Sequence, residues 1–232
     1  MELDSARIIV AGATGVLGEG IARELDARGA RVALLGRDAD RLGRLGDDLK
    51  APIALLDLAS PDEIPACVND AVTALDGLDG IVIATGVAGF GAEPALAATT
   101  IHELFLVNTL GPISLIRSAL DQLSGRGTVV ALSAVVAEHP MAGLAAYSAS
   151  KAALSAYLVA LRRERRREGL TVLDVRPSHL DTGFETRALA GEPPALPAAA
   201  DHRAVVTAIV DAMRDGRREL AFDLRAGALV AK

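Results

Sequence analysis

The sequence predicts an α/β protein built on a doubly wound parallel sheet, a three-layer arrangement with helices on both faces. Short apolar runs alternate with helical patterns along the chain, and most of these runs are apolar at successive positions rather than at every second one. Strands that are apolar on both faces belong between two layers of helices, and strand–helix alternation is typical of a parallel sheet. With 232 residues, 51% of them hydrophobic, the chain has enough apolar material for one such domain over residues 1–232. We expect about seven strands.

Each element follows from its local composition. Runs rich in Val, Ile and Leu favour strands, whereas stretches of Ala, Leu, Glu and Arg with apolar residues at helical spacing favour helices. The expected strands are ARIIVAG, ARVALLG, PIALLDL, GIVIATG, GTVVALSA, LTVLDVRP and RELAFD. The expected helices cover residues 19–28, 38–49, 61–75, 99–123, 147–163 and 201–215.

A glycine-rich loop follows the first expected strand. Gly12, Gly15 and Gly18 are spaced G-x-x-G-x-x-G in "AGATGVLGEG" and open the first helix. Glycines at this place permit a tight turn, bring backbone N–H groups close to a pyrophosphate and let helix and strand pack closely, and the helix N-terminus adds positive potential. The loop predicts a Rossmann dinucleotide-binding site. The alternative is a glycine turn selected for packing alone.

The end of the second expected strand indicates which dinucleotide would bind. An acidic residue there would accept hydrogen bonds from the adenosine ribose, whereas an arginine can pair with a 2′-phosphate. Here Gly36 ends the strand and Arg37 follows, which favours NADP, while Asp38 keeps NAD as the alternative. An exposed turn arginine without a ligand is the competing interpretation of Arg37.

A tyrosine and a lysine lie one helical turn apart in "LAAYSASKAAL". Tyr147 and Lys151 have Cβ atoms about 5 to 6 Å apart if this segment is helical. The ammonium would then favour the ionised phenol and lower its pKa from about 10 toward neutrality, where a proton donor is useful. Taken alone, the pattern also fits an ordinary surface helix.

Charge and composition restrict the kinds of partner that we expect the protein to bind. A net charge of −6 and a pI near 5.3 disfavour nucleic acid, which rewards clustered Lys and Arg. The single cysteine, Cys67, excludes an internal disulfide, and the four histidines lack metal-ligand spacing, so we expect no metal site. We see neither a secretory signal nor a run of the ~20 apolar residues that span a bilayer. A cytoplasmic protein with no membrane partner is expected.

The glycine loop, the order of strands and "YSASK" together resemble the short-chain dehydrogenase/reductase superfamily, in its compact single-domain branch, over almost the whole chain. The glycine spacing is atypical for that branch, since Val16 stands where it normally has glycine. Further segments match in order: "DL" after the third strand, "ATG" after the fourth, "LVNTLGP", and "RPSHLDT". The cofactor-binding residues that the resemblance implies are Gly12, Thr14, Gly15, Val16, Leu17, Gly18, Arg37, Asp57, Leu58, Ala84, Gly86, Tyr147, Lys151, Pro177, Leu180 and Thr182.

The resemblance implies an NADP-dependent oxidoreductase that transfers a hydride between the nicotinamide and a carbonyl or secondary alcohol. Tyr147 would protonate the substrate oxygen, Lys151 would lower the phenol pKa and bond the nicotinamide ribose, and Asn108 would hold a water that connects Lys151 to solvent. Residues 183–200, rich in Ala, Leu and Pro, would form a lid over an apolar substrate. The family's pairing of helices between subunits implies a homodimer or homotetramer, although packing on the chain's own sheet is the simpler explanation for Leu104, Leu115, Leu154 and Leu158.

One departure from the family concerns a serine that normally lies thirteen residues before the tyrosine and hydrogen-bonds the substrate carbonyl. Ala134 occupies that position, and the serine present is Ser133. Adjacent strand residues point to opposite faces, so Ser133 could serve only if the strand end shifted by one. Because one lost oxyanion donor costs about 10² to 10³ in rate, two alternatives remain open: a weakened or non-catalytic dinucleotide sensor or scaffold, and a lyase or dehydratase.

Overall fold

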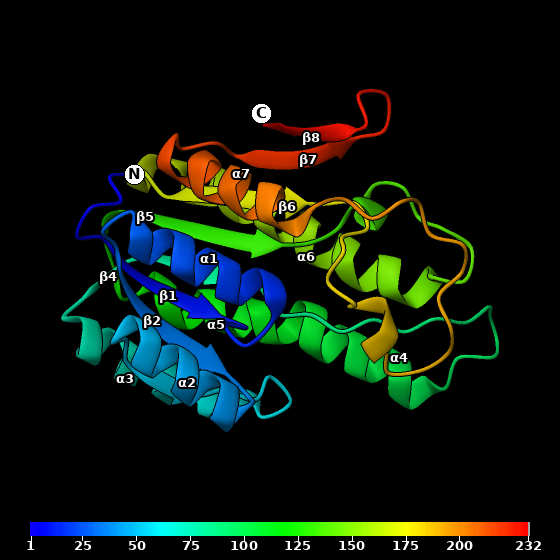
Figure 1. Ribbon diagram of the computed structural model, residues 1–232, viewed down its shortest axis with the longest axis horizontal. Helices are drawn as coiled ribbons and strands as arrows, with labels where there is room; N and C mark the ends of the chain where they lie inside the picture. Colours follow the sequence, from blue (N-terminus) through cyan, green and yellow to red (C-terminus); the bar gives the residue numbers. More distant parts are fainter. Residues whose placement is uncertain (232) are drawn as a thin grey trace.

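The computed structural model describes residues 1–231, which form one eight-stranded sheet with helices on both faces (Figure 1). The strand order is β3-β2-β1-β4-β5-β6-β7-β8. Every neighbouring pair is parallel except β7 and β8. The strands are β1 (Arg7–Ala11), β2 (Arg31–Gly36), β3 (Ile53–Leu55), β4 (Leu78–Ile83), β5 (Leu123–Leu132), β6 (Thr171–Arg176), β7 (Glu219–Asp223) and β8 (Ala228–Ala231). The predicted doubly wound α/β fold is confirmed.

The helices divide between the two faces of the sheet as the strand pattern requires. The α-helices are α1 (Val16–Ala27), α2 (Ala39–Leu49), α3 (Ile64–Leu75), α4 (Ala98–Phe105), α5 (Gly111–Leu120), α6 (Ala145–Glu164) and α7 (His202–Arg214). Apolar residues of α1, α2 and α7 pack with Ile8 and Val10 of β1 on one face. Those of α3, α5 and α6 pack with Ile9 and Ala11 on the other. Successive residues of one strand thus serve two cores, which explains the unbroken apolar runs.

Two features of the fold differ from the expectation. The helix expected over residues 99–123 is divided into α4 and α5 by a π-helical turn, η2 (Leu106–Leu110), and Leu123 already belongs to β5. Gly111 and Pro112 directly follow this turn, and proline lacks the N–H that would continue the regular hydrogen-bond ladder, so the sequence contained a break signal that the expected single helix overlooked. The eighth strand, β8, was not predicted, because its four residues are too few to produce a recognisable pattern.

The topology fixes where a ligand can bind. The chain runs outward from β1 to β2 and β3, then returns to β4 on the other side of β1. In open parallel sheets, ligands bind beyond the carboxyl ends of the strands at such a reversal. The glycine loop after β1, the "ATG" segment after β4 and the loop after β6 all lie at this edge. The fold therefore brings together motifs that are more than 70 residues apart in sequence.

The leucines considered for a subunit interface are internal. Leu104, Leu115, Leu154 and Leu158 are each at most 1% exposed, so they pack within the chain itself. Packing within the chain, the simpler explanation, therefore accounts for these leucines. Assembly into a dimer or tetramer stays a prediction. Within residues 1–231, no helix combines the length and apolar character needed to cross a membrane.

Candidate active site

A cavity of about 520 Å³ opens at the carboxyl ends of the strands. It is lined by the glycine loop, the ends of β2, β4, β5 and β6, the start of α6, and parts of the segment 183–200. All residues that the sequence assigned to the cofactor line this cavity except Gly18. Tyr147 and Lys151 are among them. Asn108 lies behind the wall and is fully buried. Apart from Gly18 and Asn108, the site residues predicted from separate motifs thus share one cavity.

The glycine loop forms a cradle that side chains would fill. Gly12 has a φ of +84°, and a Cβ there would lie 2.8 Å from the Ala84 carbonyl carbon. A Cβ on Gly18 would overlap the Gly12 carbonyl, so Gly18 acts behind the cavity by letting α1 approach the loop. Gly15 precedes α1, whose N-terminus has no side-chain cap. Uncapped N–H groups at the cavity wall suit a bound phosphate, so the loop fits a dinucleotide.

Two arginines lie where the second strand ends. Arg37 and Arg41 both line the cavity, and Arg41, one helical turn further along, was missed by the sequence reasoning. Asp38, the residue that kept NAD open, is the N-cap of α2, and its carboxylate accepts a hydrogen bond of 3.0 Å from the Arg41 backbone N–H. The Arg41 guanidinium lies 4.0 Å from Glu19. Asp38 therefore lines the cavity beside the two arginines, with one of its carboxylate oxygens engaged in the helix cap.

Lys151 is buried in the cavity wall. It is 3% exposed, and its Nζ donates a hydrogen bond of 3.0 Å to the Leu132 carbonyl at the end of β5. Room for the ammonium comes from Gly86, because a Cβ there would lie 3.1 Å from Nζ. Burial lowers the pKa of Lys151 to about 8, although the nearby Asp174 carboxylate acts in the opposite direction.

The expected effect of Lys151 on Tyr147 is wrong for the protein without cofactor. Burial raises the pKa of the Tyr147 phenol, the opposite of the predicted direction. Tyr147 is surrounded by apolar groups, with the Phe184 ring centroid 6.3 Å from its own and Leu144 and Phe90 in the same cluster. A phenolate in such surroundings loses its hydration, which disfavours the ionised form. The Lys151 ammonium is directed to the Leu132 carbonyl. The phenol therefore keeps its proton at neutral pH.

Asn108 fastens the wall of the cavity together. In η2, its Oδ1 accepts a hydrogen bond of 2.9 Å from the Val87 N–H, and its Nδ2 donates to the Val87 carbonyl at 2.9 Å and to Ser150 Oγ at 3.1 Å. Both side-chain N–H donors are used, and the partners lie on the loop after β4 and on α6. The side chain thus joins two walls of the site, and the water relay to Lys151 stays a prediction.

Ser133 and Ala134 lie directly after β5, and their side chains have different surroundings. Ser133 Oγ donates a hydrogen bond of 2.5 Å to Asp174 Oδ1 on the neighbouring strand β6. Ala134 lines the same cavity as Tyr147 and offers only a methyl group. Ser133 also lines this cavity, but its hydroxyl is directed to the neighbouring strand, and the position expected to carry a hydroxyl lacks one.

Sequence reasoning missed several residues of the wall, among them His179 and Glu185. Both line the cavity, with His179 Nε2 3.5 Å from Glu185 Oε2 and His179 Nδ1 2.9 Å from the Pro197 carbonyl. His179 lies inside the "RPSHLDT" motif, which was the available signal. It contacts both arms of the segment 183–200 and so holds that segment over the cavity.

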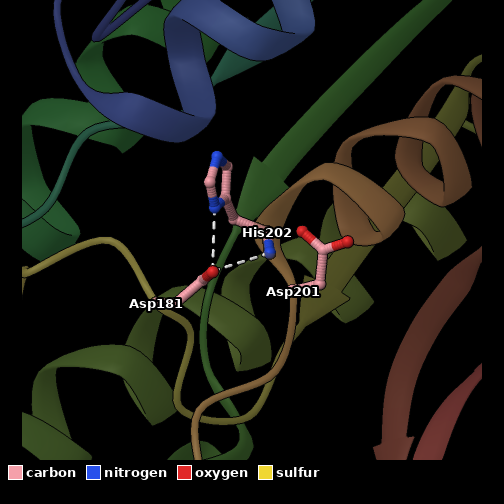
Figure 2. Close-up of side chains that lie close together, drawn as sticks. All are labelled: Asp181, Asp201 and His202. Carbon is pink, nitrogen blue, oxygen red and sulfur yellow. Dashed lines mark hydrogen bonds and ion pairs between the residues drawn. The ribbon is translucent and has the colours of Figure 1, made fainter.

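A cluster of three polar groups lies beside this segment (Figure 2). Asp181, Asp201 and His202 bring possible metal-ligand atoms within 4.8 Å of one another. Asp181 Oδ1 lies 2.8 Å from His202 Nδ1 and accepts a 2.9 Å bond from the His202 N–H, which lowers the Asp181 pKa, and Asp201 caps α7 through the Arg203 N–H. These bonds attach the loop after β6 to the start of α7. Their proximity was not expected from the sequence, in which the histidines lack metal-ligand spacing.

The burial of Lys151 leads to a prediction about stability. Between pH 8 and 10.5 the folded chain holds fewer protons than the unfolded chain at this residue, so stability rises with pH across that window. Below pH 8 the cost is complete and amounts to about 3 kcal/mol, at about 1.4 kcal/mol per pKa unit. Lys151→Met should therefore raise the free energy of unfolding at pH 7 by up to about 3 kcal/mol, measured by urea denaturation.

The matched control is Lys50→Met, because Lys50 is exposed and should leave stability unchanged. The gain from Lys151→Met should also vanish above pH 10.5, the pKa of an unburied lysine. A Lys151→Met protein that is less stable than the wild type at pH 7 would contradict this account.

Comparison with known proteins places this site in a family. A family model described as short chain dehydrogenase matches residues 6–192. Dehydrogenase/reductase SDR family member 7B of Bos taurus is 27% identical over 201 residues, covering 81% of this chain and 62% of that protein. An uncharacterized oxidoreductase of Myxococcus xanthus is 32% identical over 186 residues, covering 76% of this chain and 72% of that protein. The chain spans less than two thirds of the bovine relative's length.

Comparison with solved structures points to the same family. A short-chain dehydrogenase from Streptomyces avermitilis superposes with a TM-score of 0.86 over 97% of this chain and 90% of that chain, at 26% identity. A short chain dehydrogenase from Burkholderia cenocepacia, solved in complex with NADP, gives a TM-score of 0.81 over 92% of each chain, at 25% identity. The chain belongs to the short-chain dehydrogenase family, a class of NAD(P)-dependent oxidoreductases.

Proposed function

We propose that this protein is an NADP-dependent oxidoreductase that reduces a carbonyl, or oxidises the corresponding secondary alcohol, on an apolar substrate. The observation that carries the proposal is the shared cavity. Tyr147 and Lys151, one turn apart on α6, line the same space as the uncapped N-terminus of α1 and its glycine cradle. A phenol beside a dinucleotide cradle has a chemical use in protonating an oxygen next to the nicotinamide.

The cradle and the two arginines support NADP as the cofactor. The N-terminus of α1 would bind the pyrophosphate, and Arg37 and Arg41 would pair with the 2′-phosphate. Asp57 and Leu58 would contact the adenine, and the loop with Pro177, Leu180 and Thr182 would hold the nicotinamide end. The Burkholderia cenocepacia relative, solved with NADP, supports the same assignment.

The chain's own residues would divide the remaining work. When bound, the reduced nicotinamide supplies the hydride. Tyr147, whose raised pKa keeps its proton in place, would donate that proton to the substrate oxygen. Lys151 would bind the nicotinamide ribose and, with its charge, stabilise the phenolate that remains. Asn108 would keep α6 and the loop after β4 at a fixed distance.

The far end of the cavity supports an apolar substrate. Its walls near Tyr147 include Phe90, Met141, Leu144 and Phe184, which form one cluster with it. The segment 183–200 contributes Leu196 and Pro197 and would act as the lid. Among the described residues of 178–200, His179, Glu185 and Arg187 add charged or titratable groups to the cavity wall. The chemistry of these walls favours a hydrophobic ketone or aldehyde.

Arg37 gives a direct test of the cofactor. Hydrogen bonds to charged groups contribute about 1.5 to 3 kcal/mol, so Arg37→Gln should weaken NADPH binding at least about tenfold and leave NADH binding unchanged. Fluorescence titration of both nucleotides measures this. The matched control is Arg44→Gln, because Arg44 lies on α2 outside the cavity wall. This substitution should change neither NADPH binding nor NADH binding. Equal weakening of NADPH and NADH by Arg37→Gln would contradict the assignment.

A dinucleotide sensor without catalysis is the second candidate, favoured by the methyl group of Ala134 and the engagement of Ser133 with Asp174. The two are separated by titrating the protein with NADPH and then assaying a panel of aliphatic and aromatic ketones. The oxidoreductase predicts NADPH consumption with at least one apolar ketone. Tight NADPH binding without turnover on any member, and no effect of changing Tyr147, would favour the sensor.

A further inference from the structure

A buried cluster of charges lies directly under the turn of α6 that carries Lys151. Asp174, at the centre of β6, is fully buried. Its Oδ2 accepts a hydrogen bond of 2.6 Å from Ser155, which lies one turn after Lys151 on α6, and a bond from Arg176. Its Oδ1 accepts the bond from Ser133. The carboxylate therefore touches both the strand end and the helix that hold Lys151.

The residue types in this cluster are unexpected for their place. Residues 172, 174 and 176 alternate along β6 and face the α6 side of the sheet, where Val172 packs in the apolar core. Apolar residues at the other two positions would satisfy the fold, and a buried ion pair is often no more stabilising than such residues. The presence of Asp174 and Arg176 therefore calls for a role other than stability.

Asp174 belongs to a network of ion pairs that lies close to Lys151. Arg176 pairs with Asp174, with Glu219 at 2.7 Å and with Glu138 at 3.2 Å, while Arg162 contacts Glu219 at 3.2 Å. Glu138 and Glu219 are partly exposed, whereas Asp174 is fully buried. The Asp174 carboxylate also raises the pKa of Lys151, against the effect of burial.

We propose that Asp174 is the buried counter-charge of Lys151, a positioning residue that keeps the ammonium protonated at the cavity wall. Through Ser133 the same carboxylate fixes the end of β5, where the Leu132 carbonyl accepts the Lys151 hydrogen bond. Asp174 acts on the cofactor only through Lys151 and does not itself line the cavity. This inference rests on the proposed function, because it concerns how the lysine of that site is kept ready.

The test is the pH dependence of NADPH binding by Asp174→Asn. Loss of a nearby opposite charge lowers the pKa of an ammonium by about one unit, so the pH at which NADPH binding begins to weaken should fall from about 8 to about 7. At pH 8.5 the variant should then bind NADPH about tenfold more weakly than the wild type, and at pH 6 within about twofold. A residue with a merely structural role would weaken binding equally at every pH.

The matched control is Glu219→Gln, which removes another carboxylate partner of Arg176 but leaves Asp174 in place. Glu219→Gln should keep the wild-type pH dependence of NADPH binding. An Asp174→Asn protein with the wild-type profile would overturn the inference and leave the proposed function intact. If the wild type bound NADPH at no pH, the proposed function itself would fail.

A second readout needs no cofactor. The gain in unfolding free energy as pH rises through the Lys151 titration should begin about one unit lower in Asp174→Asn, and Lys151→Met should abolish it. If Asp174→Asn does not fold alone, adding Lys151→Met should restore folding, because the uncompensated cation is then gone. A double variant that stays unfolded would show that Asp174 serves only Arg176, which contradicts the proposal.

Discussion

Replacing Tyr147 by phenylalanine is expected to lower the turnover of an apolar ketone by about 10² to 10⁴, the range that a positioned proton donor contributes. The change removes one oxygen from the cavity wall and keeps the ring that packs near Phe184. NADPH should therefore still bind within a few-fold of the wild type. Steady-state kinetics together with a fluorescence titration measures both quantities.

The chain provides its own control for this substitution. Tyr157, the only other tyrosine, lies on the same helix α6 but packs among the residues of the sheet face, outside the cavity. Tyr157→Phe should leave turnover unchanged. If Tyr147→Phe retained full turnover, the phenol would not be the proton donor, and the proposed chemistry would have to be abandoned.

Ala134→Ser is expected to raise turnover about tenfold or more, because a preorganised donor to a developing oxyanion is worth about 10² to 10³ in rate. The new hydroxyl would lie in the wall that also holds Tyr147, where the substrate oxygen is expected. The natural hydroxyl of Ser133 cannot fill this place while it donates to Asp174. The effect should appear in kcat more than in KM, since the bond strengthens as charge develops.

Ala137→Ser, three residues further along and outside the cavity wall, should have no effect on turnover. An Ala134→Ser protein with wild-type turnover would contradict this account, because the missing hydroxyl would then not limit the rate.

The fold could be predicted almost completely because its information is local. Alternation of apolar runs with helical patterns fixes a parallel sheet, and strands such as β1 reveal two buried faces through their unbroken apolar sequence. The sequence signals a helix break at Gly111 and Pro112, but not the π-helical turn just before it. Strand β8 is a short edge strand defined by its pairing with β7 and could not be predicted.

The site was predictable where contiguous motifs carry it and unpredictable where tertiary contacts do. The glycine loop, "ATG", "YSASK" and "RPSHLDT" each supply residues that line the cavity. The pKa of Tyr147 was assigned the wrong direction because helical spacing reveals the neighbouring charge but not the loss of hydration. The contact of Asp174 with Ser133 joins residues 41 positions apart, and nothing in "VLDVR" indicates it.

The most direct test of the central claim is a crystal structure of the protein grown with NADP⁺. The account predicts the pyrophosphate over Gly12 and Gly15 at the N-terminus of α1, the 2′-phosphate beside Arg37 and Arg41, and the nicotinamide next to the Tyr147 hydroxyl. A nucleotide bound elsewhere, or a nicotinamide ring remote from Tyr147 and Lys151, would contradict it.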